Sequence, residues 1–166
     1  FHGRTPHASL GGRSLCAAPF DGRRLGARIA DLKPPLPETT LWGMGIASGA
    51  ELRHFFNALR SPASFWTVTK LVLTHWKDLL LHRRGMRLVN GNALAAALAT
   101  SALEVGVEIR TRCAARRLLR GSDERGQRVT GAVLATPEGV VEIKARCGVV
   151  LACGGFPHDD ARKATL

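Results

Sequence analysis

A pair of glycines, Gly154 and Gly155, has the clearest chemical implication in this sequence. The pair follows residues 149–153, an apolar run that is typical of a buried parallel strand. In open parallel α/β sheets, ligands bind beyond the carboxyl ends of the strands. Glycine there lets the backbone approach a flat or phosphorylated ligand, and its amide can point at that ligand. A plain tight turn explains the pair about as well as a binding site does.

Other catalytic patterns are missing from the sequence. The cysteines form no Cys-x-x-Cys pair, and no histidine stands at a spacing that suits zinc. No serine or cysteine has a base at a recognisable spacing. Gly43-x-Gly45 is only a fragment of the Gly-x-Gly-x-x-Gly fingerprint, and no complete copy follows a strand. We therefore expect no metal site, and we expect Cys147 and Cys153 to be small apolar fillers around a buried strand.

Composition limits the class of protein. The chain has 166 residues, the size of about one domain, and its 45% hydrophobic and 22% charged residues are ordinary for a globular protein. Its net charge of +11 raises nucleic acid or an anionic membrane as partners. The basic residues are scattered, however, and there is no Tyr for base stacking, so we expect no nucleic-acid partner. Charged residues interrupt the apolar stretch 65–81, so we expect no transmembrane segment.

Several elements are expected before residue 106. Many Gly and Pro residues predict an irregular segment over 1–45. Ser48 and Glu51 form a capping-box pattern for one helix, and Ser61-Pro62 predicts the start of a second. Phe65, Val68, Val72, Trp76 and Leu79 recur at helical spacing, which favours an amphipathic helix packed on a core over a helix lying on a membrane surface. A third, alanine-rich helix is expected over 92–105, ending at Gly106.

The remainder is predicted to be rich in strands. Residues 107–111 and 115–119 are strand candidates, and a polar loop is expected over 121–127. Residues 128–135 and 140–145 alternate and are joined by Thr136-Pro137-Glu138-Gly139, which predicts an antiparallel hairpin. A helix that ends at glycine and leads at once into a strand is half of a parallel crossover unit. The fold class that follows is α/β, with a parallel sheet, a crossover helix and a hairpin laid against the sheet.

This order of elements, and several motifs within it, resemble a known family. The runs 87–94, 101–107, 128–133 and 148–159 are similar to FAD-binding dehydrogenases of the fumarate reductase/succinate dehydrogenase flavoprotein superfamily, in the branch close to 3-ketosteroid dehydrogenases. Gly11-Gly12-Arg13 and residues 20–26 also resemble this branch. The resemblance covers most of the chain. It implies a Rossmann-like FAD-binding domain of the glutathione-reductase type, of which this sequence holds the second half.

The resemblance also implies cofactor roles for ten residues. Cys113, Ala114 and Ala115 match a stretch whose backbone meets the adenine. Ala152, Cys153, Gly154 and Gly155 match a closing strand and turn that pack on FAD. Asn90, Gly91 and Asn92 match a loop near the flavin or the substrate. Ordinary strand filler remains the alternative for Ala114 and Ala115, and a turn with a helix N-cap remains the alternative for Asn90-Gly91-Asn92.

The expected function is that of part of an FAD-dependent dehydrogenase or reductase, in which hydride passes between a carbon substrate and flavin. Two alternatives stay open: an inactive, truncated remnant of this fold, and a basic module that binds nucleic acid or an acidic partner. The chain lacks an initiator Met, and we expect a piece of a longer, cytoplasmic protein, inactive alone, with its catalytic residues in other segments. The substrate is expected to be a small molecule, either steroid-like or a carboxylate.

The expected division of the chain has three parts. Residues 1–85 hold the irregular segment and two amphipathic helices of the same larger fold. Residues 86–156 form the second half of the FAD-binding domain. Residues 157–166 start a connection to a substrate-capping domain.

Overall fold

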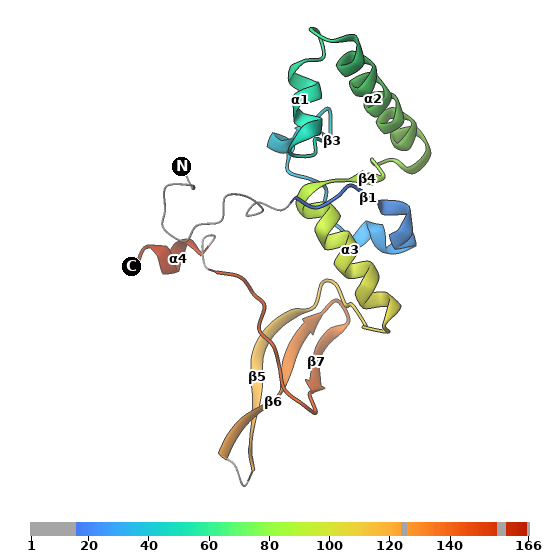
Figure 1. The fold of residues 1–166 in the computed structure, drawn as a ribbon. Helices are drawn as coiled ribbons and strands as arrows, with labels where there is room; N and C mark the ends of the chain where they lie inside the picture. The colour runs from blue at the N-terminus through green and yellow to red at the C-terminus, as the bar shows by residue number, and fades with distance from the viewer. Residues whose placement is uncertain (1–15, 124–125, 156–158, 166) are drawn as a thin grey trace, which may run out of the picture. The chain divides into compact units, whose positions relative to one another are not determined.

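The structure, a computed structural model, describes residues 16–123, 126–155 and 159–165. The chain divides into two units, Phe1–Ile109 and Arg110–Leu166 (Figure 1). Helices and sheets occur together, which confirms the mixed character of the expected fold.

The core of the first unit forms where a short ladder meets a helix. Strand β1 (Phe20–Asp21) pairs antiparallel with β4 (Arg87–Leu88), and the 3-10 segment η2 (Gly22–Asp31) follows β1 directly. Helix α3 (Asn90–Glu104) packs on both (Figure 1). Because the buried positions of α3 include Ala93 and Ala96, the helix backbone can approach closely. The core cluster consists of Leu25, Leu88, Ala93 and Ala96.

Helix α3 confirms the third predicted helix, although it begins two residues before position 92. It ends as expected near Gly106, which has a φ of 81° and therefore suits glycine. The N–H of Val107 closes this end by donating to the carbonyl of Ala102.

The segment predicted to be irregular contains short elements. Besides β1 and η2, it holds the 3-10 turn η3 (Pro37–Thr39) and the antiparallel strands β2 (Thr40–Leu41) and β3 (Met44–Gly45). Trp42 and Gly43 both have positive φ between these strands, as a tight two-residue hairpin requires. The motif Gly11-Gly12-Arg13 lies outside the described residues.

Two helices, α1 (Ala50–Phe56) and α2 (Pro62–His82), pack against each other in the first unit. The start of α2 is as predicted, with Ser61 as N-cap and Pro62 in the first turn. The capping box at α1 was wrong: Gly49 occupies the N-cap position, with a φ of 83° and no side-chain cap. The Glu51 carboxylate accepts instead from the backbone N–H of Ala47, and Ser48 is bonded to Asn90.

The face that α2 turns toward its own unit is partly polar. Its buried residues are Ser64, His75 and Asp78. Phe65 and Trp76, expected in a core, are 54% and 51% exposed. Among the described residues, this predicted apolar face is therefore not enclosed in a core. Apolar residues surround most of this helix, and periodicity alone does not choose the side that packs.

The second unit is an antiparallel sheet of three strands in the order β5-β6-β7. Strand β5 (Ala114–Asp123) pairs with β6 (Gly126–Thr136), which pairs with β7 (Gly139–Lys144). The predicted hairpin is confirmed, and its turn lies between Thr136 and Gly139. A short helix, α4 (Asp160–Lys163), is also present.

Three predictions about strands were wrong. Residues 107–111 form no strand, and the expected loop 121–127 is largely taken up by β5 and β6, because the polar residues continue the ladder. Residues 149–153 form no strand either, although their composition suits one. A strand requires a hydrogen-bonded neighbour, and this run has no neighbour in any described sheet. All sheet pairing among the described residues is antiparallel, so the expected parallel sheet is not among them.

Candidate functional site

The first candidate segment, Asn90-Gly91-Asn92, forms the start of helix α3. Asn90 has a φ of 52°, a conformation that asparagine tolerates better than most residues. Its Oδ1 accepts from the Ser48 hydroxyl at 2.9 Å, and its Nδ2 donates to the Ile46 carbonyl at 2.9 Å. Asn90 therefore fixes the loop before α1 to the start of α3. The sequence suggested only a turn with a helix N-cap at this position.

Gly91 is exposed and has open space around it. A Cβ added at this position would meet no atom within 4 Å. The neighbouring Asn92 donates its Nδ2 to the Lys33 carbonyl at 2.8 Å, which fixes the segment from the other side. The first turn of an α-helix has N–H groups without partners in the helix, and these favour an anionic group. Small size, open space and this helix end fit a phosphate-bearing cofactor.

A pocket of about 200 Å³ adjoins this segment. Asn92, Val89, Gly43 and Gly45 contribute to its lining, as does the buried His75. Pockets that hold a whole cofactor or drug-sized ligand usually measure about 300–1,000 Å³. This pocket is therefore large enough for only a part of FAD.

Two of the three arginines that line the pocket, Arg84 and Arg87, have protein partners. Arg84 donates to the carbonyls of Ile29 and Leu32 at 2.6 and 3.1 Å. Arg87 forms a close ion pair with Glu51 of α1. Their first role is therefore to hold the elements around β4 together.

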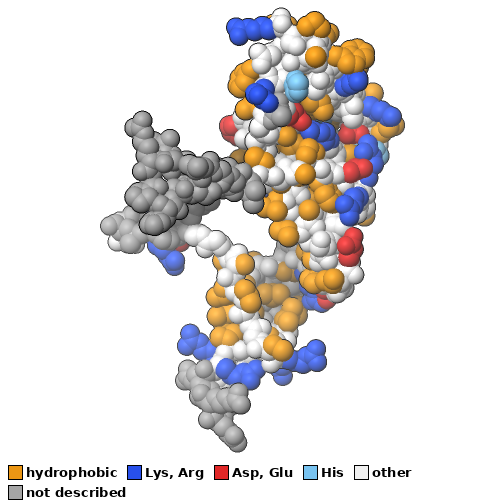
Figure 2. Space-filling view, in the orientation of Figure 1, with side chains coloured by type: hydrophobic (Ala, Val, Ile, Leu, Met, Phe, Trp, Pro, Cys, Tyr) orange, Lys and Arg blue, Asp and Glu red, His pale blue; other side chains and the backbone are white. Residues whose placement is uncertain are grey.

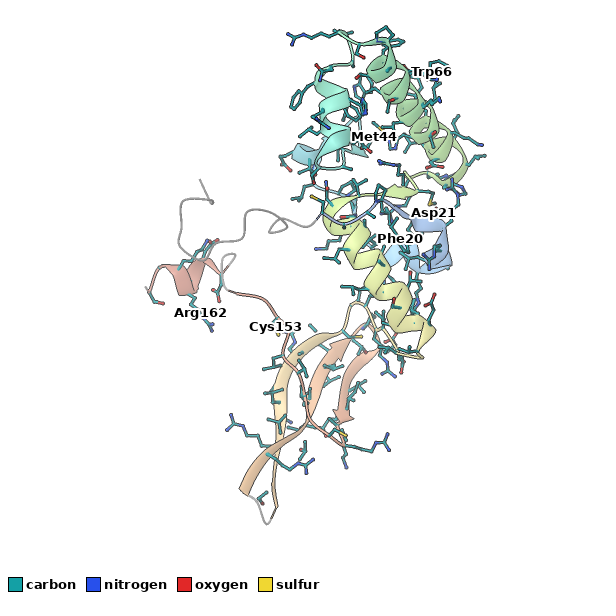
Figure 3. The ribbon with its side chains drawn as sticks, in the orientation of Figure 1. Phe20, Asp21, Met44, Trp66, Cys153 and Arg162 are labelled. Atoms are coloured by element: carbon teal, nitrogen blue, oxygen red, sulfur yellow. The ribbon has the colours of Figure 1, made fainter. Side chains whose placement is uncertain are left out.

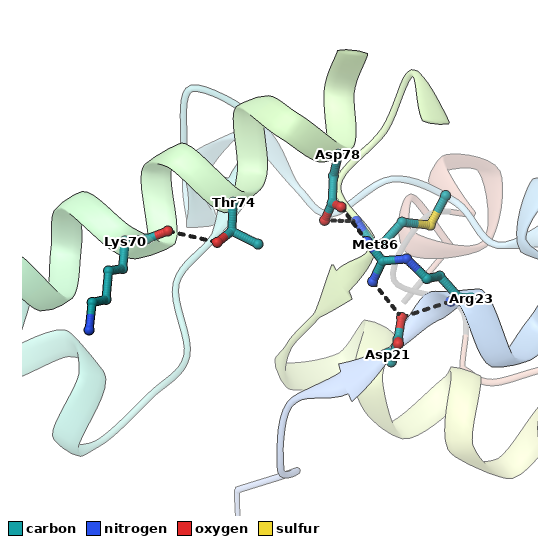
Figure 4. Close-up of polar contacts among 6 residues, drawn as sticks. All are labelled: Asp21, Arg23, Lys70, Thr74, Asp78 and Met86. Atoms are coloured by element: carbon teal, nitrogen blue, oxygen red, sulfur yellow. Dashed lines mark hydrogen bonds and ion pairs between the residues drawn. The ribbon is translucent and has the colours of Figure 1, made fainter. Parts of the chain in front are cut away.

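A buried carboxylate network joins α2 to the β1–β4 ladder (Figure 4). Asp78 is 1% exposed and accepts from Arg23 Nη2 at 2.5 Å and from the Met86 backbone N–H at 3.0 Å. Arg23 also bonds Asp21 at 3.1 Å. These contacts hold β4, and hence the start of α3, at a fixed distance from α2. This network was not predicted from the sequence. The feature of the sequence that points to it is the interruption of the apolar run 65–81 by His75 and Asp78. The same interruption argues against a transmembrane helix.

The second candidate segment, Cys113-Ala114-Ala115, lies at the start of β5 in the second unit. Ala114 and Ala115 pair with Ala135 and Leu134 of β6, so strand filler explains part of their character. Both alanines are nevertheless exposed, and a register shift follows Ala115. Their side chains are small enough for a flat ligand to approach the backbone. The Cys113 thiol lies 3.3 Å from the Thr111 carbonyl.

The third candidate segment, Ala152-Cys153-Gly154-Gly155, is exposed and belongs to no strand (Figure 3 labels Cys153). Gly154 has a φ of 71°, and a Cβ there would meet no atom within 4 Å. The expectation that Cys147 and Cys153 are buried was wrong, since both are exposed. Both cysteines lie in or beside residues 149–155, which have no hydrogen-bonded neighbouring strand among the described residues and so are not enclosed in a sheet. Their open backbone also fits a flat ligand.

These segments carry no arrangement for metal chemistry within the described ranges. Residues 16–123, 126–155 and 159–165 contain no group of three His, Cys, Asp or Glu side chains that could hold an ion. Among the same residues we find no helix with the length and apolar character needed to span a bilayer.

The chain is similar to known proteins over most of its length. A family model described as "FAD binding domain" matches residues 3–166. The chain is 34% identical to the 4-oxocyclohex-2-ene-1-carboxylate 5-dehydrogenase of Sinomonas cyclohexanicum, over 94% of this chain and 28% of that protein. It is 30% identical to the 3-oxosteroid 1-dehydrogenase of Comamonas testosteroni, over 90% of this chain and 26% of that protein.

The chain is also similar to a solved structure. The 3-ketosteroid delta1-dehydrogenase of Sterolibacterium denitrificans, in complex with 1,4-androstadiene-3,17-dione, matches with a TM-score of 0.71 and 33% identity. The match covers 90% of this chain and 27% of that one. The chain thus spans a little over a quarter of the length of the relatives it matches. These matches confirm the expected resemblance to FAD-dependent dehydrogenases.

Proposed function

We propose a function from one premise: this chain belongs to the FAD binding domain family, whose model covers residues 3–166. The cofactor of the family is FAD. We propose that the chain supplies part of the FAD site of an oxidoreductase, and that the complete protein transfers hydride between a carbon substrate and flavin. The observation that carries this proposal is the family match over nearly the whole chain, together with small, open residues at all three candidate segments.

Each candidate segment has a proposed role. Gly91 and the first turn of α3 face a negatively charged part of the cofactor, with Asn90 and Asn92 as positioning residues that hold this turn. Cys113, Ala114 and Ala115 meet the adenine through their backbone. Ala152, Cys153, Gly154 and Gly155 pack on FAD once residues 149–153 have joined a parallel sheet.

In this proposal, FAD and the protein contribute different parts of the reaction. When bound, FAD supplies the hydride acceptor or donor. The residues of this chain bind and orient it, and the excess of positive charge assists in holding the pyrophosphate. Groups that move protons on the substrate are proposed to lie in other segments, since the relatives are more than three times as long as the matched region.

The proposed domain organisation follows the same premise. Residues 1–85 belong to the same larger fold, residues 86–156 form the second half of the FAD-binding domain, and residues 157–166 lead toward a substrate-capping domain. The complete protein is proposed to act in the cytoplasm. The names of the two relatives both describe a molecule with an oxo group on a ring. We therefore propose that the substrate is a small molecule with a ring oxo group, either steroid-like or a carboxylate.

The first test is the visible absorption spectrum of the complete protein purified from its host. The two bands of oxidised flavin are expected. Bleaching of these bands by candidate ring ketones would then identify the substrate. A colourless protein that takes up no added FAD would contradict the proposal and favour an inactive remnant of the fold.

A single substitution tests the site itself. Gly91→Ala adds only a methyl group to an exposed helix position with free space, so the stability of the cofactor-free protein should change by less than about 1 kcal/mol. If the backbone of Gly91 lies against FAD, the Kd for FAD should rise at least about tenfold, equivalent to about 1.4 kcal/mol. Flavin fluorescence titration measures this change. Ser101→Ala, about 15 Å further along the same helix, is the matched control. An unchanged Kd for Gly91→Ala would remove this segment from the site.

A further inference from the structure

The outward side of α2 is an apolar stripe that residues 16–109 of the first unit leave exposed. The stripe consists of residues that recur at helical spacing and are 51–86% exposed: Phe65, Trp66, Leu73, Trp76 and Leu80. At 100° per residue these five side chains span about 100° of the helix surface. Figure 2 shows hydrophobic side chains beside Lys and Arg in this part of the molecule, and Figure 3 labels Trp66 on α2. We define these five residues as the outer stripe.

Lysines border the outer stripe. Lys70 and Lys77 follow it on one side of the helix, and the Lys70 ammonium lies 5.3 Å from the centre of the Trp66 ring. Long lysine side chains cover apolar surface with their methylenes while keeping the charge at the edge. A stripe of Trp, Phe and Leu with basic residues beside it is the composition of a helix that lies in a membrane interface.

The acidic residues of the helical pair are turned inward. Residues 50–85 contain two acids, Glu51 and Asp78, which pair with Arg87 and Arg23. The same stretch contains six Lys and Arg residues, of which five are exposed: Arg53, Arg60, Lys70, Lys77 and Arg83. The outer surface of the pair is therefore apolar and positively charged, and it is complementary to an anionic surface.

The apolar surface continues at the connection between α1 and α2. Leu59 is 96% exposed and Phe56 is 74% exposed. Leu59, Phe65 and Trp66 line a shallow hollow there together with Arg60. Like the outer stripe, this tip combines aromatic and aliphatic groups with a cation.

We propose that the outer stripe and the tip of the α1–α2 pair dock the protein on an anionic lipid surface. The stripe would lie at the boundary of headgroups and acyl chains, with Lys70 and Lys77 reaching anionic headgroups. A second copy of the chain fits less well, because two such faces in contact would bring like charges together. This docking is peripheral, and it does not depend on the proposed redox activity.

The test is co-sedimentation of the complete, FAD-loaded protein with vesicles of phosphatidylcholine alone or mixed with phosphatidylglycerol. We expect binding to the anionic vesicles that weakens as salt rises. The Lys70→Gln/Lys77→Gln variant should bind about fivefold more weakly for each lysine removed. The Trp66→Ser/Trp76→Ser variant should bind at least about tenfold more weakly. Val140→Ser, which removes an exposed apolar side chain from β7, is the matched control and should bind as the wild type does.

Flavin absorbance and circular dichroism of each variant show whether it is folded, and the lysine variant changes only exposed polar groups. Absence of binding by the wild-type protein would overturn the proposal, and the stripe would then be covered by another part of the protein's own chain or by a second copy. Equal binding by all variants would also overturn it. A concentration-dependent dimer that the tryptophan variant abolishes, without vesicle binding, would assign the face to a second copy.

Discussion

At the scale of single residues, a few polar side chains determine how the elements of the first unit meet. Asp78 joins α2 to η2 through Arg23 and to the loop before β4 through Met86, and Asn90 joins the start of α3 to residues 46–48. Both are partly or fully buried, and each makes more than one hydrogen bond. Buried polar groups are costly when a partner is lost, so the effect of a substitution should depend on the network that it breaks.

Replacing Asp78 should destabilise the protein more than replacing any exposed ion-pair partner. Asp78→Ala leaves the Met86 N–H without its acceptor and removes the inward partner of Arg23. Because Arg23 is half exposed and can be hydrated, we expect a loss of about 2–3 kcal/mol in the free energy of unfolding. Urea unfolding of the FAD-loaded protein measures it.

The matched control is Glu142→Gln, which breaks the exposed Arg117–Glu142 pair. An exposed pair of this kind contributes about 0–1 kcal/mol. Similar losses for Asp78→Ala and Glu142→Gln would show that the buried network does not stabilise the unit.

At the scale of elements, the sequence predicts what local signals determine. Ser61-Pro62 places the start of α2, Gly106 places the end of α3, and the turn after Thr136 places the β6–β7 hairpin. Each signal acts within a few residues, through capping or turn chemistry. The outward face of α2 could not be predicted in this way, because apolar residues lie on both of its sides and the choice depends on Asp78 and His75.

The prediction of a strand at residues 149–153 was wrong for a related reason. Its composition is that of a strand buried on both faces, yet a strand exists only where a neighbouring backbone completes the ladder. In the described part of the second unit no such neighbour pairs with it, and Val150 is 92% exposed. Composition therefore describes the environment that a segment suits, whereas the ladder depends on residues far away in the chain.

Within the second unit, Gly131 determines how closely β6 and β7 approach. A Cβ at this position would collide with the backbone carbonyl oxygen of Ile143 and lie 3.0 Å from the Lys144 Cα. Backbone atoms in a ladder cannot move aside without breaking it, so Gly131→Ala should cost about 2–3 kcal/mol. Thermal unfolding of the FAD-loaded protein would show the lower midpoint.

Gly121→Ala on β5 is the control, because the added methyl group would meet only the side chain of Thr130, which can rotate. A smaller loss, about 1 kcal/mol or less, is expected there. If the two variants were equally stable, the close approach at Gly131 would not be what limits this position.

At the scale of the whole molecule, exposed apolar surface is the dominant feature. Large apolar side chains lie exposed on α2, on α3 at Leu94 and Leu98, and in the run 149–153. Contiguous apolar patches of this kind usually mark contacts with other protein or with membrane. The chain also spans only 28% and 26% of its two relatives. We propose that the faces on α3 and in the run 149–153 pack against further segments of a longer protein, whereas the outer stripe of α2 faces lipid.

This surface leads to a prediction for residues 1–166 expressed alone. Two-state unfolding requires that most apolar surface be buried in one cooperative core, whereas the described core of the first unit is a small cluster around Leu25 and Ala96. We expect marginal solubility, binding of a hydrophobic dye such as ANS, and a broad thermal transition by circular dichroism. Adding FAD should sharpen the transition little, since the fragment holds only part of the site. A sharp two-state melt without dye binding would show instead that the two units bury these faces by themselves, and it would also remove the basis for assigning the run 149–153 to a larger sheet.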